Sequence, residues 1–194
     1  MNRISIKVEN TVPINKAHLQ SPKEIIRFMQ EEIGTSAHEC FVVLYLNSYL
    51  NPLSYQIAGI GEQDRVEFSP YAIFQGALLE NSTRIILVHN HPNGKAMASQ
   101  ADVIATHKLE TVAMMMRATI LDHIVVTGNE YFSMRQNHLL LSENQNAMVE
   151  EYSELLRKMR EGEELDWKYS DFDYQEIPDE VKEAMPGVQK IEDE

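Results

Sequence analysis

The segment His89-Asn90-His91 has the residue types and the spacing of a metal site. Residues two apart on a β-strand point to the same face, so both imidazoles can reach one metal ion. The apolar run before them, Ile85-Ile86-Leu87-Val88, predicts a buried strand. The histidine pair therefore lies where this strand ends, before a loop with Pro92 and Gly94 that leaves room for an open coordination position.

A carboxylate follows the two histidines at a distance that suits a third ligand. Seven residues separate His91 from Ser99, and Asp102 comes three positions later. Two histidines and a carboxylate form a three-ligand zinc set that leaves the fourth position to water, as catalytic zinc sites do. Bound zinc lowers the pKa of that water to about 7. The pattern predicts Zn²⁺ held by His89, His91 and Asp102.

The same residues also have ordinary structural interpretations. Ser99-Gln100-Ala101-Asp102 is a capping box, in which a serine and an acidic residue satisfy the free backbone groups of a helix start. A histidine at a strand end is often only a polar surface residue. The two interpretations of Asp102 are compatible, because a carboxylate in a first helical turn can still project toward the histidines.

The apolar patterning predicts an α/β domain, a mixed β-sheet flanked by helices. Ser21-Pro22-Lys23-Glu24 indicates a helix start with a capping box and proline in the first turn. Further helices are predicted over about 70–78 and 99–117, and strands over 4–8, 39–47, 52–60, 84–91, 120–127 and 131–134. We expect the methionine run 114–116 to fill the core.

The order His89-x-His91-Pro92, Ser99 and Asp102 resembles the JAMM motif of the MPN-domain metalloproteases. The surrounding stretches 85–94 and 121–128 are similar to the RadC branch, and the resemblance covers roughly 21–141. It implies an MPN/JAB domain with a cytidine-deaminase-like layered fold. It also implies a zinc-dependent metallopeptidase or isopeptidase that acts on a protein or peptide substrate.

The resemblance also implies a glutamate on an earlier strand that deprotonates the attacking water, and Glu39 is the residue that matches. Glu39 directly precedes the apolar run 40–46, where an acidic side chain is poorly placed for solvent. The alternative is an exposed residue at a strand start. Ser99 would stabilise the tetrahedral oxyanion by hydrogen bonding.

Other polar candidates have weaker claims on the site. Cys40 follows Glu39 and therefore points to the opposite face, which predicts a core thiol. His107 lies about 140° around the helix from Asp102 and faces elsewhere. His123 matches a position of the family that is not a ligand, and it could support a ligand through a hydrogen bond.

The net charge of −13 is concentrated in an acidic C-terminal extension. Residues 143–194 hold 17 acidic and 6 basic residues, a net of −11, whereas residues 1–142 carry −2. We therefore divide the chain into a domain over 1–142 and an extension over 143–194. We expect the extension to hold one amphipathic helix and an acidic tail that is disordered or orders on a partner. The charge argues against direct nucleic-acid binding, and the tail could engage a basic partner.

The composition also limits the class of protein. The apolar runs fall short of the roughly 18 residues of a membrane helix and no signal peptide is evident, which predicts a cytoplasmic protein. A single cysteine excludes the Pro-Cys-x-x-Cys ligand pair of zinc nucleobase deaminases. The alternative to an enzyme is a RadC-like non-catalytic binding or regulatory module, DNA-repair-associated or from a mobile element, that uses its acidic tail.

Overall fold

A computed structural model describes residues 11–14, 19, 21–61 and 68–143, together with 153, 157, 158, 160, 161, 189 and 190 of the extension. The strand expected over 4–8 lies outside the described residues, as does nearly all of the acidic tail. The described residues between 153 and 161 are helical, in agreement with the helix expected there. The division of the chain at Ser142 stays a prediction. Within the described ranges, every helix is too short or too polar to cross a membrane.

The described strands form a seven-stranded sheet in the order β1-β3-β2-β4-β5-β6-β7. β4 and β5 are parallel and all other neighbours are antiparallel, so the sheet is mixed, as predicted. The strands are β1 Thr11–Pro13, β2 Cys40–Leu46, β3 Pro52–Ile60, β4 Arg84–Asn90, β5 Thr119–Val126, β6 Glu130–Ser133 and β7 Gln189–Lys190. The predicted strands therefore agree with the observed ones within one or two residues wherever they are described.

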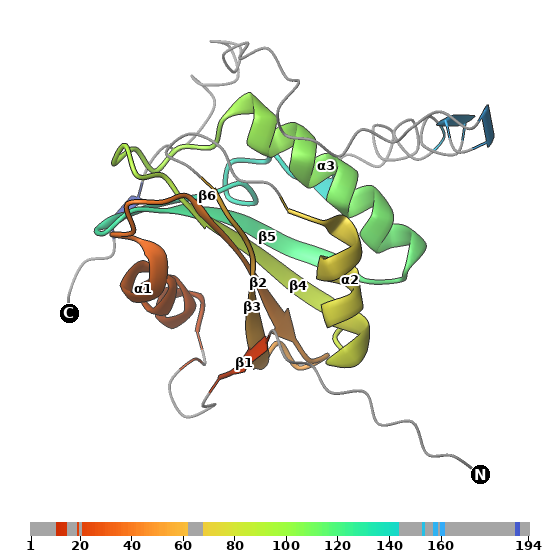
Figure 1. Ribbon diagram of the computed structural model, residues 1–194, viewed down its shortest axis with the longest axis horizontal. Helices are drawn as coiled ribbons and strands as arrows, with labels where there is room; N and C mark the ends of the chain where they lie inside the picture. The colour runs from red at the N-terminus through yellow and green to blue at the C-terminus, as the bar shows by residue number, and fades with distance from the viewer. Residues whose placement is uncertain are drawn as a thin grey trace.

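Helices cover both faces of this sheet (Figure 1). α1 Pro22–Ile33 packs on one face, while α2 Pro70–Leu79 and α3 Gln100–Met115 lie on the other. α1 begins with the capping box predicted from Ser21 and Glu24, with Pro22 at its first position. A short 3₁₀ turn, η2 Leu141–Glu143, follows β6. The observed architecture is the predicted α/β fold, a mixed sheet flanked by helices.

The central strands have continuous apolar sequences because both faces of the sheet are covered there. Every residue of β2 is buried, and alternate residues join two different cores. Val42 and Leu44 pack with α1, whereas Phe41 and Val43 pack with α2 and α3. Cys40 lies in the α1-side core, as predicted. Glu39 and Phe41 are two residues apart and so point to the same face, which places Glu39 on the α2/α3 side of the sheet.

The methionine run at the end of α3 corrects one expectation. Met115 and Met116 are exposed, at 42% and 37% of their surface, so they do not fill the core as expected. Successive helical residues are turned by about 100°, so three in a row cannot all face one core. At this helix end Ala113 is buried in the core and Val112 packs against it.

Candidate metal centre

The predicted metal ligands come together at one end of β4. His89 is the penultimate residue of β4, His91 directly follows the strand, and Asp102 lies in the first turn of α3. The two imidazole Nε2 atoms are 3.0 Å apart. Asp102 Oδ1 lies 3.4 Å from His89 Nε2, and Asp102 Oδ2 lies 3.7 Å from His91 Nε2. Three donor groups from a strand, a loop and a helix thus face one another.

The spacing of these atoms fits a single zinc ion. Donors at about 2.0–2.1 Å from a tetrahedral zinc are about 3.3 Å from one another, and the observed separations bracket that value. His89 and Asp102 are almost completely buried, whereas His91 is partly exposed and borders the solvent. The donor set and its spacing are therefore compatible with one bound metal ion, and His91 is the member that reaches the solvent.

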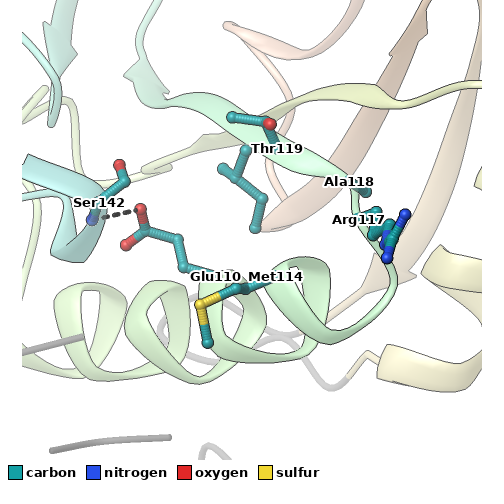
Figure 2. A pocket seen from close by; sticks show the side chains of 7 residues that line it. Glu110, Met114, Arg117, Ala118, Thr119 and Ser142 are labelled. Carbon is teal, nitrogen blue, oxygen red and sulfur yellow. Dashed lines mark hydrogen bonds between the residues drawn. The ribbon is translucent and has the colours of Figure 1, made fainter. Parts of the chain in front are cut away.

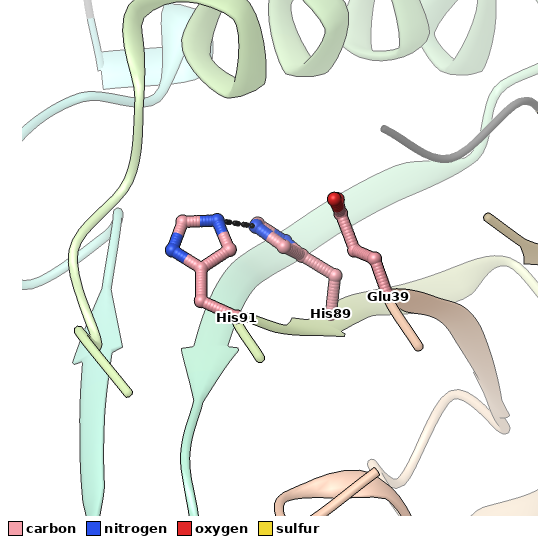
Figure 3. A group of neighbouring side chains, drawn as sticks. All are labelled: Glu39, His89 and His91. Carbon is pink, nitrogen blue, oxygen red and sulfur yellow. Dashed lines mark hydrogen bonds between the residues drawn. The ribbon is translucent and has the colours of Figure 1, made fainter. Parts of the chain in front are cut away.

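Glu39 lies beside the two histidines. One of its carboxylate oxygens and one ring nitrogen of each of His89 and His91 lie within 4.8 Å of one another. Figure 3 shows the three side chains projecting to the same side of the sheet. Glu39 is only 4% exposed, so it is not the solvent-facing residue that the alternative interpretation describes. Glu39, His89 and His91 therefore form a group that could hold a metal ion. Asp102 offers its two carboxylate oxygens to the same imidazoles, at 3.4 and 3.7 Å, so both carboxylates face the histidine pair.

Ser99 and Asp102 form the capping box and the metal-facing group together. The Ser99 backbone N–H donates to Asp102 Oδ2 at 2.6 Å, and the Asp102 N–H donates to Ser99 Oγ at 3.2 Å. The cap uses Oδ2 and leaves Oδ1 toward His89. Ser99 Oγ accepts in this cap and so still has a hydrogen to donate. The predicted capping box is therefore confirmed, and it leaves Asp102 facing His89, so the role of Asp102 as a metal ligand stays a prediction.

Burial and the charges of neighbouring side chains shift the pKa values of the ionisable groups in the site. Burial alone would raise the pKa of Asp102, but the charge of His89 and a hydrogen bond with it hold that pKa well below its usual range. Burial opposes a charged His89, yet the carboxylates of Asp102 and Glu39 raise the pKa of His89. Burial and the charge of His89 lower the pKa of His123 strongly. The site thus keeps an ionised carboxylate in the interior, which favours a cation there.

The outer nitrogen of each imidazole has a hydrogen-bond partner, an exposed one for His91 and a buried one for His89. His91 Nδ1 donates to the carbonyl of Lys95 at 3.0 Å, which leaves Nε2 as the bare nitrogen. His89 Nδ1 lies 2.8 Å from His123 Nε2, and His123 Nδ1 lies 2.6 Å from Thr106 Oγ1. His123 therefore contacts the predicted ligand His89 at Nδ1, the ring nitrogen that faces away from Asp102 and His91.

Asn90, between the two histidines, has a structural role that the sequence did not reveal. Its side chain points to the α1 side and accepts from the Cys40 N–H at 2.8 Å. Its amide nitrogen donates to the carbonyls of His38 at 3.1 Å and Ser36 at 3.4 Å. Asn90 therefore ties the segment that carries Glu39 to the end of β4. No local pattern could indicate these contacts, because the partners lie about fifty residues away in sequence.

The remaining polar groups lie away from the site. The Nε2–H of His107 donates to the carbonyl of Leu139, as expected for a side chain that faces elsewhere. His138 is exposed and pairs with Glu143. A cavity of about 320 Å³ is lined by Glu110 and Met114 of α3, by residues 117–120 and by Ser142 of η2 (Figure 2). The Glu110 carboxylate accepts the backbone N–H groups of Leu141 and Ser142, so it fixes that turn against α3.

Comparison with known proteins identifies the family of this chain. Residues 19–139 match the family described as "RadC-like JAB domain". A "UPF0758 protein" of Streptococcus gordonii is 35% identical over 135 residues, which cover 70% of this chain and 58% of that protein. A UPF0758 protein of Streptococcus sanguinis is 33% identical over 67% of this chain and 57% of that protein. One of Methanosarcina mazei is 31% identical over 66% of this chain and 56% of that protein. This chain spans slightly more than half the length of these relatives. The chain belongs to the RadC-like JAB domain family.

Proposed function

We propose that this chain is a zinc-dependent amide hydrolase of the JAMM type, a metallopeptidase or isopeptidase. The observation that supports the proposal best is the set of donor atoms of His89, His91 and Asp102, whose separations suit one tetrahedral zinc. Glu39 beside an open side of that set supplies the acid–base group that hydrolysis needs. The substrate in this proposal is a peptide or isopeptide bond of a protein.

Each residue has one task in the proposed reaction. Bound zinc supplies a Lewis acid for the scissile carbonyl and lowers the pKa of water to about 7. The Glu39 carboxylate accepts a proton from the attacking water as its oxygen bonds to the carbonyl carbon. Glu39 then delivers that proton to the amide nitrogen as the C–N bond breaks. The Ser99 hydroxyl donates to the carbonyl oxygen as it becomes negative.

Zinc content of the purified full chain tests the ligand set. We expect about one zinc per chain in the wild type and a sharp loss of affinity in His89→Ala, His91→Ala and Asp102→Ala, because two ligands make a poor zinc site. Ser99→Ala should keep the metal. His138→Ala is the matched control, since this exposed histidine lies away from the site. Full zinc occupancy in the double variant of His89 and His91 would contradict the proposed site.

Cleavage tests the reaction itself. A library of peptides and isopeptide-linked peptides is incubated with the zinc-loaded chain, with and without a chelator. We expect cleavage that the chelator abolishes and that zinc restores. A chain that binds zinc and cleaves no member of the library would favour the non-catalytic binding module over the enzyme.

A further inference from the structure

A row of three buried polar side chains crosses the layers behind the candidate metal centre. Thr106 lies on α3, His123 on β5 and His89 on β4, and none is more than 1% exposed. Thr106 Oγ1 lies 2.6 Å from His123 Nδ1, and His123 Nε2 lies 2.8 Å from His89 Nδ1. In each contact either group can be the donor or the acceptor. The direction of the row, meaning which group donates at each hydrogen bond, therefore depends on how one end is fixed.

The end at Thr106 is fixed by a backbone carbonyl. Thr106 Oγ1 also lies 2.6 Å from the carbonyl oxygen of Asp102. A carbonyl can only accept, so the hydroxyl hydrogen of Thr106 lies between these two oxygens. The other potential acceptor, Met134 Sδ, is 3.5 Å away, and a thioether is a weak acceptor. Thr106 Oγ1 therefore has only a lone pair to offer His123.

The role of Thr106 as acceptor then determines which ring nitrogens of His123 and His89 carry a hydrogen. His123 Nδ1 must carry the hydrogen that the Thr106 oxygen accepts, so in the neutral ring Nε2 is bare. That bare nitrogen accepts the hydrogen of His89 Nδ1, whether His89 is neutral or charged. In the neutral His89 ring the bare nitrogen is consequently Nε2, the atom that faces Asp102 and His91.

We propose that Thr106 and His123 are positioning residues that fix His89 in the tautomer able to bind a metal through Nε2. The inference rests on the proposed zinc site and adds residues that are not ligands. His91 obtains the same tautomer directly from the carbonyl of Lys95, a group that cannot reverse its role. An imidazole partner can donate or accept, so His89 needs Thr106 as a third group to set the direction.

Zinc affinity in threonine variants tests the proposal. Thr106→Val keeps the shape and removes the hydroxyl, so His123 loses the acceptor that fixes its tautomer. We expect zinc affinity, measured by competition with a chromogenic chelator, to fall about 10- to 100-fold. Thr106→Ser should restore it to within a few-fold of the wild type. Thr111→Val is the matched control, because the buried Thr111 hydroxyl bonds the carbonyl of His107 on the same helix without contacting a histidine ring.

The tautomer itself can be measured without zinc, which separates this inference from the proposed function. A long-range ¹H–¹⁵N correlation spectrum of the metal-free wild type, labelled at histidine, should show His123 with a hydrogen on Nδ1 and a bare Nε2. A hydrogen on Nε2 of His123 would overturn the proposal, even if the chain binds zinc. Wild-type zinc affinity in Thr106→Val, or an equal loss in Thr111→Val, would also overturn it. If the wild type binds no zinc, the proposed function fails and the spectrum alone decides the direction of the row.

Discussion

At the scale of single residues, Asp102 shows how one side chain meets a structural and a chemical need together. Its Oδ2 accepts the Ser99 N–H in the helix cap, and its Oδ1 faces His89. The cap therefore holds the carboxylate in place before any cation binds, which lowers the entropy lost when a ligand site is ordered. The carboxylate is also more than 95% buried and has lost its contact with bulk water, so a bound cation would stabilise its charge.

Glu39→Gln should separate metal binding from chemistry. Glutamine keeps the size of the side chain but cannot accept the proton of the attacking water. We expect zinc content to stay near one per chain while turnover falls about 10²- to 10⁴-fold, the usual contribution of a positioned proton acceptor. Elemental analysis and the cleavage assay measure the two effects on the same preparation.

The control for this variant is Glu31→Gln, which removes an exposed carboxylate from α1. Its turnover should match the wild type. Loss of zinc in Glu39→Gln would make Glu39 a direct ligand, and unchanged turnover would remove it from the mechanism.

The sequence reveals those site residues whose relation is local. His89 and His91 are two residues apart and Asp102 begins a helix, so spacing alone suggested one metal site. Thr106 and Asn90 were missed, because their partners come from other strands and loops. A threonine inside a helix and an asparagine in a strand carry no signal until the folded neighbours are known.

At the scale of elements, the strands were predicted well because both faces of the central sheet are covered. Continuous apolar runs and the turns that bound them define β2 and β4 without knowledge of the neighbours. β3 and β5 also contain polar and partly exposed residues. The order of the strands in the sheet was not predicted. It depends on long-range pairing, such as Phe41 opposite His89, which brings the start of β2 beside the end of β4.

Asn90→Ala should weaken the junction between these two strands. The change removes the acceptor of the buried Cys40 N–H and both donors to residues 36 and 38. We expect the free energy of unfolding in urea to fall by about 1–3 kcal/mol, the cost of an unsatisfied buried group. Zinc should stay bound, because both histidines remain, while turnover falls as Glu39 loses its fixed position.

Asn47→Ala is the matched control at the opposite end of β2. The Asn47 side chain accepts the N–H groups of Tyr49 and Asn51 in an exposed turn away from the site. Its loss should reduce stability less and leave turnover unchanged. Equal turnover in both variants would show that Asn90 does not position Glu39.

At the scale of the whole molecule, charge is distributed unevenly along the chain. The extension carries −11 of the net −13, and two of its residues, Gln189 and Lys190, pair with β6 at the edge of the sheet. The extension therefore contacts the domain at this edge, next to Glu130 and Tyr131. With 30 acidic residues, the stability of the chain varies with pH through many groups at once, and a single group is isolated only by comparison with a variant.

Asp122 is the group whose contribution to this pH dependence has a defined sign. Burial raises the pKa of Asp122 to about 6, although the Ser133 hydroxyl and the Arg135 N–H donate to its carboxylate and act against the shift. In the unfolded chain the pKa of an aspartate is about 3.9. Between these values the folded state binds more protons than the unfolded state, so the contribution of Asp122 to stability falls as the pH rises.

Asp122→Asn should remove this dependence, because asparagine imitates the protonated acid and does not titrate. Its carbonyl oxygen can accept from the Arg135 N–H, and its amide can donate to Ser133 Oγ. Relative to the wild type, the variant should gain up to about 3 kcal/mol in free energy of unfolding between pH 4 and pH 7.5, with the change centred between about 4 and 6. Urea unfolding of both proteins in excess chelator measures this difference without a contribution from zinc loss at low pH. A difference that stays constant with pH would show that Asp122 titrates alike in the folded and unfolded chain, and a difference that shrinks as the pH rises would show that its folded pKa is lowered.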